Sequence, residues 1–321
     1  MSTKDKKSSY NYGEFYSEIK LIHDLSVPKA EQDWVLTNPK NATPHEVVLY
    51  LGCNVLRTSH MIRTVYDIFK MLDVDFVAVG GGSFCCGSPY TREGDTEVAQ
   101  DINQHTVDSF MKFQPERVVM WCPSCIHSYD EVFQTEQPYK KQHVTQFLVE
   151  KLDQLNFVQD VPLKVAMHYH IANESRRAEA EAARQLFQAL PGCEYIDIES
   201  DERLSRHCTA EVQAKLGPGV WDGIIQSQLD SAVEQGATTF ATIYHGCQRL
   251  ICPMEAQSPI PIEHYLTVFA RGLGIEYPDQ YKQWKLWKDP AKVLEEMAPC
   301  MQANNIDPQK AEAMVARNFG G

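Results

Sequence analysis

The second half of the chain repeats the pattern of the first half, and this duplication limits the folds that the sequence can adopt. The segment KVAMHYHI at 164–171 resembles VVLYLGCN at 47–54, and FATIYHGCQRL at 240–250 resembles RVVMWCPSCIH at 117–127. A period of about 120 residues indicates a duplicated domain, because the repeats of solenoid proteins are much shorter. The sequence therefore predicts two related halves packed about a pseudo-twofold axis.

Each half alternates apolar strands with amphipathic helices. In the first half, an apolar run ends at Gly52, and apolar residues then recur at helical spacing from Met61 to Leu72. A second apolar run, a helical segment and a third apolar run follow at 76–79, about 92–113 and 117–121. Strands that alternate with helices of this length favour parallel sheets. We therefore expect an α/β fold made of two duplicated Rossmann-like halves with parallel sheets.

Four regions are expected along the chain. Residues 1–45 are polar and mixed, and they form an N-terminal arm. Residues 46–155 form the first half and residues 156–274 form the second half. Residues 275–321 form a helical tail, in which apolar side chains such as Trp284 provide the packing contacts.

The composition excludes several classes of protein. The chain has 321 residues, of which 43% are apolar, so it can bury a substantial core. Asp and Glu number 43 against 30 Lys and Arg, and the net charge of -13 repels the phosphates of nucleic acids. No apolar stretch approaches the roughly 18 residues of a membrane span, and the start lacks the apolar core of a secretory signal. We expect a cytoplasmic protein that binds no nucleic acid and has no transmembrane segment.

Half of the ten cysteines lie in one window of the first half. Each of the five follows the end of an expected strand, and they are Cys53, Cys85, Cys86, Cys122 and Cys125. The carboxyl ends of parallel strands share one edge of a sheet, so we expect these five thiols to converge there. In a reducing cytoplasm such thiols bind metals, act as catalysts or pack in the core, rather than form disulfides.

The number and spacing of these thiols favour a multi-iron cluster over zinc. A tetrahedral zinc site and a cubane cluster each take four ligands, which leaves one thiol over. The adjacent pair Cys85 and Cys86 fits awkwardly around one ion but can reach two different irons. Gly81, Gly82 and Gly87 allow positive φ and close approach of backbone N–H groups to anionic sulfur. The alternative is that some of these cysteines pack in the core without a metal.

The pattern of Cys53, the run CCGSP at 85–89 and CPSC at 122–125 resembles the CCG domain of the noncubane iron–sulfur subunit of heterodisulfide reductase and its relatives. The resemblance covers roughly residues 46–270. It implies that the five cysteines bind a noncubane 4Fe–4S cluster, and that the chain is an oxidoreductase acting on sulfur groups. It also implies partners, namely a ferredoxin-like iron–sulfur subunit and a flavoprotein subunit of the same complex. The substrate implied is a thiol, a disulfide or a sulfur-carrier protein.

The second half departs from this family pattern. Where a complete motif would have five cysteines, it has His170, His207, Cys208, Tyr244 and Cys247. His170, His207, Cys208 and Cys247 could hold zinc or a smaller cluster, because imidazole and thiolate both suit zinc. Alternatively, these side chains form a hydrogen-bonded wall without a metal.

Histidines of the second half are candidates for proton donors. They are His168, His170, His207 and His245. Imidazole titrates in the range that proton transfer near neutral pH requires. The alternative for each of them is a structural role.

Together these features predict an iron–sulfur redox subunit of a heterodisulfide-reductase-like complex that reduces or forms a disulfide or persulfide-type bond in sulfur metabolism. The chain has no Cys-x-x-Cys-x-x-Cys run and no dinucleotide fingerprint, so electrons must enter or leave through other proteins. Two alternatives remain open. One is an electron-transfer iron–sulfur subunit of a glycolate or lactate oxidation system, and the other is a metal-stabilised scaffold that carries no electrons.

Overall fold

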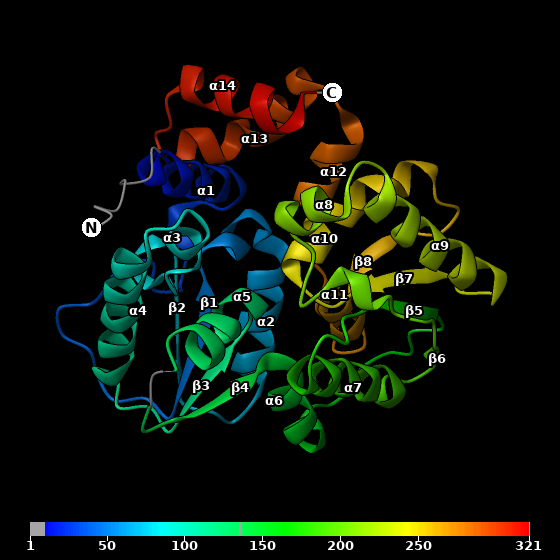
Figure 1. Cartoon of the computed structure of the whole chain (residues 1–321), viewed down its shortest axis with the longest axis horizontal. Helices are drawn as coiled ribbons and strands as arrows, with labels where there is room; N and C mark the ends of the chain where they lie inside the picture. Colours follow the sequence, from blue (N-terminus) through cyan, green and yellow to red (C-terminus); the bar gives the residue numbers. More distant parts are fainter. Residues whose placement is uncertain (1–9, 135–136, 321) are drawn as a thin grey trace, which may run out of the picture.

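The computed structural model describes residues 10–134 and 137–320 and contains two parallel four-stranded sheets (Figure 1). The first sheet has the order β2-β1-β3-β4 and consists of β1 (Val47–Gly52), β2 (Phe76–Gly80), β3 (Arg117–Met120) and β4 (Lys140–His143). The second sheet has the equivalent order β6-β5-β7-β8 and consists of β5 (Lys164–His168), β6 (Glu194–Ile196), β7 (Thr239–Thr242) and β8 (Ile262–His264). All neighbouring strands are parallel. The predicted α/β fold with two parallel sheets is confirmed.

Helices connect the strands of each sheet. Those of the first half are η2 (Asn54–Arg57), α2 (Ser59–Met71), η3 (Gly82–Phe84), α3 (Ser88–Arg92), α4 (Thr96–Met111), α5 (Pro123–His127), η4 (Ser128–Val132) and α6 (Val144–Glu150). The short helix η5 (Leu152–Gln154) ends the first half. Those of the second half are α7 (Glu174–Ala189), η6 (Glu202–Leu204), α8 (Ala210–Leu216), α9 (Val220–Glu234), α10 (His245–Ile251), η7 (Cys252–Gln257) and α11 (Tyr265–Arg271). All six residues of β1 are buried, as is typical of a parallel strand covered on both faces. The helix expected at about 92–113 begins later, at Thr96, because Gly94 adopts a φ of 86° between α3 and α4.

The N-terminal arm contains a helix that packs against the C-terminal tail (Figure 1). The elements involved are α1 (Tyr12–Ser26), followed by η1 (Lys29–Glu31), and the tail helices α12 (Gln280–Trp287), α13 (Pro290–Ala303) and α14 (Pro308–Phe319). Ile22 and Leu25 of α1 share an apolar core with Trp284, Val293 and Phe319 of the tail. The helical tail is thereby confirmed, whereas residues 1–9 of the predicted arm lie outside the described residues. Among the described helices, none is long and apolar enough to cross a membrane.

The two halves share one continuous apolar core. Leu49 of β1 and Met167 of β5 belong to the same cluster of buried side chains. Helix α2 packs against α11, and α6 packs against α7, so the helices between the sheets form the contact. The halves are therefore one folded body rather than two domains on a linker.

Two aromatic contacts between the halves are reciprocal. Trp121, which follows β3, stacks on His264 at the end of β8 with ring centroids 5.5 Å apart. Tyr244, which follows β7, packs edge-on against His143 at the end of β4 at 5.8 Å. Because β3 and β4 correspond to β7 and β8, each half contacts the other through the same strand ends, although Tyr244 lies at the position of Cys122 rather than at that of Trp121. This arrangement turns the carboxyl ends of both sheets toward a shared central region.

Candidate metal centre and adjoining cavity

Three neighbouring strands deliver cysteines to one edge of the first sheet. Cys53 directly follows β1, and Cys122 comes two residues after β3. Cys85 and Cys86 follow β2 after the short helix η3, and Cys125 lies in the first turn of α5. Since β2, β1 and β3 are adjacent and parallel, their carboxyl ends meet there.

The five thiols contact one another in a continuous series, which we call the thiol cluster. The side chains lie next to one another in the order Cys53, Cys85, Cys86, Cys125 and Cys122, and each affects the pKa of its neighbour. All are buried except Cys122, which is partly exposed. The structure thus brings together the five cysteines that the sequence singled out, and their role as iron ligands remains a prediction.

Donors from the surrounding chain point at the sulfur of Cys85. The phenol of Tyr16 donates a hydrogen bond to Cys85 Sγ at 2.9 Å, and the backbone N–H of Gly87 donates to the same atom at 3.4 Å. Such donors stabilise anionic sulfur and suit a bound cluster. The contact of Tyr16 comes from α1 and was not predicted. The aromatic run of residues 10–16 was its only signal in the sequence.

The thiols of the cluster divide into two groups by acidity. Hydrogen bonds from Cys53 and Cys86 lower the pKa of Cys85 well below its usual value. A hydrogen bond from Cys125 does the same for the pKa of Cys122, and the nearby ring of His245 lowers it further. The pKa values of Cys53, Cys86 and Cys125 are raised in turn, because each lies beside a thiolate in a buried setting. Cys85 and Cys122 are therefore the thiols of the cluster that lose a proton most readily, and a metal binds thiolate rather than thiol.

Glycines around the thiol cluster leave room for the side chains that form it. Gly52, Gly81 and Gly87 adopt φ values of 75°, 91° and 84°, and a Cβ on Gly52 would lie 3.4 Å from Cys125 Sγ. Gly82 differs from the expectation, since it does not have a positive φ. Its missing side chain instead makes room for the ring of Tyr16, which a Cβ would approach to 3.2 Å.

We expect Gly87→Ala to destabilise the protein by about 2–4 kcal/mol, because a Cβ at φ 84° is strained and would lie 2.4 Å from the backbone oxygen of Ala99. Chemical denaturation measures the change. Gly94→Ala is the matched control, since its φ is 86° but nothing lies within 4 Å of the added Cβ. The control should lose only about 1 kcal/mol. Equal losses in the two variants would show that the clash with Ala99 is relieved at no cost.

Two histidines of the second half reach the thiol cluster. The ring of His245 lies close enough to Cys122 to lower the pKa of that thiol, and His207 Nε2 lies 2.7 Å from the Oγ of Ser124, which stands between Cys122 and Cys125 in the sequence. Burial lowers the pKa of His207 to about 4, so its ring is neutral at pH 7. His170 lies elsewhere, beside Cys247. Of the predicted proton donors, His207 and His245 are thus the two placed at the thiols.

A second group of metal-binding side chains lies in the second half, and we call it the His–Cys cluster. It consists of His168, His170, Cys208 and Cys247, whose ligand atoms all lie within 4.8 Å of one another. The group expected from the sequence contained His207 in place of His168. The structure differs because His207 turns away from its neighbour Cys208 toward Ser124 of the first half. Such a group can bind a metal ion.

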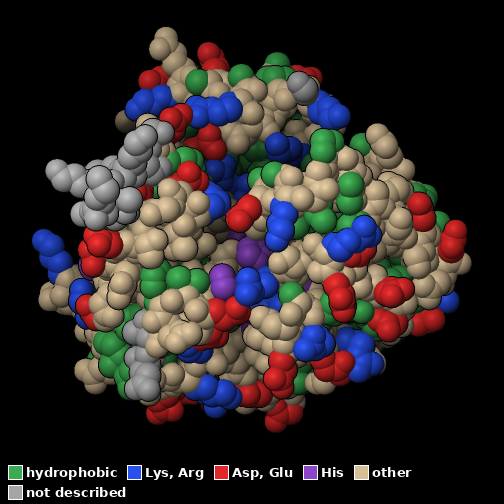
Figure 2. All heavy atoms as spheres, in the orientation of Figure 1, with side chains coloured by type: hydrophobic (Ala, Val, Ile, Leu, Met, Phe, Trp, Pro, Cys, Tyr) green, Lys and Arg blue, Asp and Glu red, His purple; other side chains and the backbone are tan. Residues whose placement is uncertain are grey.

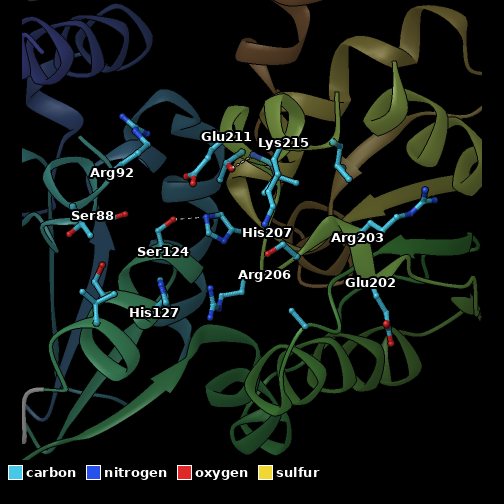
Figure 3. Close-up of a pocket in the computed structure, with 18 of the residues that line it drawn as sticks. Ser88, Arg92, Ser124, His127, Glu202, Arg203, Arg206, His207, Glu211 and Lys215 are labelled. Atoms are coloured by element: carbon cyan, nitrogen blue, oxygen red, sulfur yellow. Dashed lines mark hydrogen bonds between the residues drawn. The ribbon is translucent and has the colours of Figure 1, made fainter. Parts of the chain in front are cut away.

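A cavity of about 1010 Å³ opens between the halves, beside the thiol cluster. Ser88, Arg92, Ser124 and His127 line it from the first half, and Arg206, His207 and Lys215 face them from the second half (Figure 3). Five cationic side chains line this inter-half cavity against two acidic ones, and the cationic residues are Arg92, Arg177, Arg203, Arg206 and Lys215. Histidine side chains are visible at its centre, in a hollow of the molecular surface (Figure 2). A cavity of this size and charge can admit a small anionic molecule to the edge of the thiol cluster.

A smaller cavity of about 310 Å³ lies on the other side of the thiol cluster. Tyr16, Cys85, Tyr90 and His105 are among its lining residues. Cys85 is therefore the thiol nearest to this second opening, and the side chain of Tyr16 of α1 partly covers Cys85.

The fold and the thiol cluster define a cysteine-rich α/β protein with a candidate metal centre. Comparison with known protein families also indicates a cysteine-rich domain. Residues 47–129 match the profile of the cysteine-rich domain family named CCG, and this range contains all five thiols of the thiol cluster. Residues 47–129 of the first half are thus similar to this family, as the motif predicted.

Similarity to individual proteins extends beyond residues 47–129 and covers most of the chain. One subunit of the dihydromethanophenazine:CoB–CoM heterodisulfide reductase of Methanosarcina barkeri is 23% identical over 84% of this chain and 70% of its own length. The same subunit of the Methanosarcina acetivorans enzyme is 21% identical over 75% of this chain and 62% of its own. An uncharacterized iron–sulfur protein of Methanocaldococcus jannaschii is 26% identical over 50% of this chain and 32% of its own. The chain is therefore related to heterodisulfide reductase subunits, and it spans about two thirds of their length.

Solved structures add no functional information. A putative Asp/Glu racemase from Yersinia pestis matches 71% of this chain and 97% of its own at 11% identity, with a TM-score of 0.33. This similarity is too low to support an inference.

Proposed function

We propose that the first half, residues 46–155, holds a noncubane 4Fe–4S cluster on the thiol cluster. In this proposal the chain is the iron–sulfur subunit of a heterodisulfide-reductase-like complex of sulfur metabolism. It reduces or forms a disulfide or persulfide-type bond at that cluster. The observation that carries the proposal is the convergence of five thiols, each next to another in a continuous series, beside a cationic cavity. Five thiolates are more than a zinc ion or a cubane takes.

The residues around the thiols fit such a group. Tyr16 and the Gly87 N–H direct hydrogens at sulfur, and Gly52 leaves open space beside Cys125. When bound, the cluster supplies iron positions that hold sulfur and accept or donate single electrons. The aromatic rings of Tyr50 and Phe84 are fully buried next to the thiols and exclude water from them.

Reduction of a disulfide consumes two electrons and two protons and yields two thiols, so the site needs both an electron route and a proton route. Arg92, Arg206 and Lys215 attract an anionic substrate into the inter-half cavity. His207, neutral at pH 7 and hydrogen-bonded to Ser124, and His245, in contact with Cys122, are the imidazoles placed to relay protons.

Electrons arrive or leave through partner proteins in this proposal. The relatives are named as subunits of a multi-subunit heterodisulfide reductase, which supports partner subunits for this chain as well. We propose a ferredoxin-like iron–sulfur subunit and a flavoprotein subunit in the cytoplasm as these partners, and a thiol, a disulfide or a sulfur-carrier protein as the substrate.

Anaerobic reconstitution with iron and sulfide tests the proposal. We expect about four irons per chain and a visible chromophore, with a paramagnetic signal after oxidation. Mercaptoacetate, an anionic thiol, should change that signal more strongly than uncharged 2-mercaptoethanol, because the cavity is cationic.

The possible outcomes separate the proposed function from its alternatives. A protein that takes up no iron would contradict the redox function and favour a metal-stabilised scaffold. A cluster whose signal responds to neither thiol would favour simple electron transfer, as in a hydroxy-acid oxidation system.

A further inference from the structure

The His–Cys cluster is buried at the carboxyl edge of the second sheet. His168 ends β5, His170 follows it by two residues, and Cys247 lies in the first turn of α10. Cys208 completes the group from the loop between η6 and α8. No member is more than 2% exposed. Four ligand-type side chains are thus held together away from water.

The two imidazole rings are oriented by acceptors outside the group. His168 Nδ1 lies 2.8 Å from Gln228 Oε1, and His170 Nδ1 lies 3.0 Å from the backbone oxygen of Ser205. The amide of Gln228 is itself fixed, because its Nε2 donates to the backbone oxygen of Glu199 at 3.0 Å. Both Nδ1 atoms therefore face acceptors and carry the hydrogen. Each Nε2 consequently offers a lone pair to the centre of the group.

The lone pairs of both rings point at sulfur. His168 Nε2 lies 3.2 Å from Cys208 Sγ, and His170 Nε2 lies 3.3 Å from Cys247 Sγ. Cys208 Sγ also lies 3.7 Å from His170 Nε2, so the four atoms form one group rather than two separate pairs. Thiols are weak hydrogen-bond donors, so S–H···N bonds alone stabilise two oriented imidazole rings only weakly. Metal-binding histidines, in contrast, usually have their second nitrogen held by an acceptor in this way.

We propose that the second half binds one Zn²⁺ through His168 Nε2, His170 Nε2, Cys208 Sγ and Cys247 Sγ. Two nitrogens and two thiolates in a tetrahedral arrangement are a typical zinc ligand set. With four protein ligands and no exposed face, no coordination position is left for water or substrate. The ion is structural.

The zinc site has a consequence for the thiol cluster. His207 precedes the ligand Cys208, and His245 lies two residues before the ligand Cys247. The ion therefore anchors both segments that carry histidines to the first half. This positioning role rests on the proposed function, whereas zinc binding itself does not.

Metal analysis of the full chain, purified and then dialysed after incubation with Zn²⁺, tests the proposal. We expect about one tightly bound zinc per chain. Cys208→Ser and Cys247→Ser should each lose most of that zinc, while Cys193→Ser, which lies outside the group, should keep it. Circular dichroism checks that the variants are folded. Variants that are folded and keep the zinc would overturn the assignment.

Cobalt substitution of the unaltered protein is a second test that needs no variant. Co²⁺ should give the intense visible bands of a tetrahedral site, together with sulfur-to-metal charge transfer. Weak octahedral bands would overturn the proposal. After iron reconstitution, zinc and iron are counted in the same sample, so loss of one metal is distinguished from loss of the other. Iron and sulfide remaining in a Cys86→Ala chain in place of zinc would show that the His–Cys cluster holds a small iron–sulfur cluster instead.

Discussion

Replacement of Cys86 by alanine is expected to leave the reconstituted protein without its iron–sulfur chromophore and with almost none of the iron of the unaltered chain. Cys86 lies in the middle of the thiol cluster, where it joins Cys85 to Cys125. Its loss divides the five ligands and removes one of two adjacent thiols that can reach different irons. Iron and sulfide determination, together with the visible spectrum after anaerobic reconstitution, measures the effect.

The fold around Cys86 should survive this change. The backbone oxygen of Cys85 accepts from Thr106 Oγ1 at 2.7 Å, and that of Cys86 accepts from Asn103 Nδ2 at 3.0 Å. These bonds do not depend on either thiol. Cys193→Ala and Cys300→Ala are the controls, because both cysteines are partly exposed and lie outside the thiol cluster. Unaltered iron content in Cys86→Ala would refute the ligand assignment.

Arg176→Met is expected to cost about 3–5 kcal/mol of folding free energy near pH 8, because it leaves the carboxylate of Glu179 buried without its partner. Arg176 Nη2 lies 2.9 Å from Glu179 Oε1, and both side chains are at most 3% exposed. The phenol of Tyr244 donates to Glu179 Oε2 at 2.5 Å and cannot replace the lost charge. Urea denaturation at fixed pH measures the loss.

Two controls separate this effect from the loss of an arginine in general. Arg184→Met, on the same helix α7, breaks an exposed pair with Glu181 and should cost less than about 1 kcal/mol. The double variant Arg176→Met/Glu179→Gln should be more stable than Arg176→Met alone, because no charge remains buried. A double variant that is no more stable would mean that packing, rather than charge, explains the loss.

The pH dependence of stability follows from the same carboxyl group. Burial raises the pKa of Glu179 from its ordinary value of 4.5 to about 7. Between these two values the folded chain holds a proton that the unfolded chain has released. Stability therefore falls as pH rises through this window, by about 3 kcal/mol in total. Glu179→Gln should remove this slope, and Arg176→Met should cost less at pH 5 than at pH 8.

The sequence was sufficient to predict the thiol cluster because it depends on local signals. The apolar runs of β1 and β3 are buried on both faces, so their ends were visible in the pattern, and the cysteines that follow them had to share one edge. The contact between Tyr16 and Cys85 could not be predicted in this way. It joins residues 69 positions apart and depends on how α1 packs against η2 of the first half and against the tail.

The exchange of His207 for His168 in the His–Cys cluster has a similar cause. Alignment of the two halves predicted which positions correspond to each other. It did not predict the direction in which each side chain points. His207 and Cys208 are adjacent in an irregular segment, and their side chains leave it in different directions, one toward Ser124 and the other toward His168. Only the packing between the halves decides which of the two faces the second sheet.

The packing of α1 against the tail sets an order of events during synthesis. On the ribosome, α1 emerges long before α13 and α14, the helices with which it shares a core. Helix α1 also packs against the first half, where Glu18 pairs with Arg57 at 2.9 Å and the ring of Tyr16 stacks near that of Tyr90. The first half therefore holds Tyr16 over Cys85 from one side, and the tail later fixes the helix from the other side. In the proposed function, the completed tail thus limits movement of α1 away from Cys85 and, with it, the access of oxidants to a bound cluster.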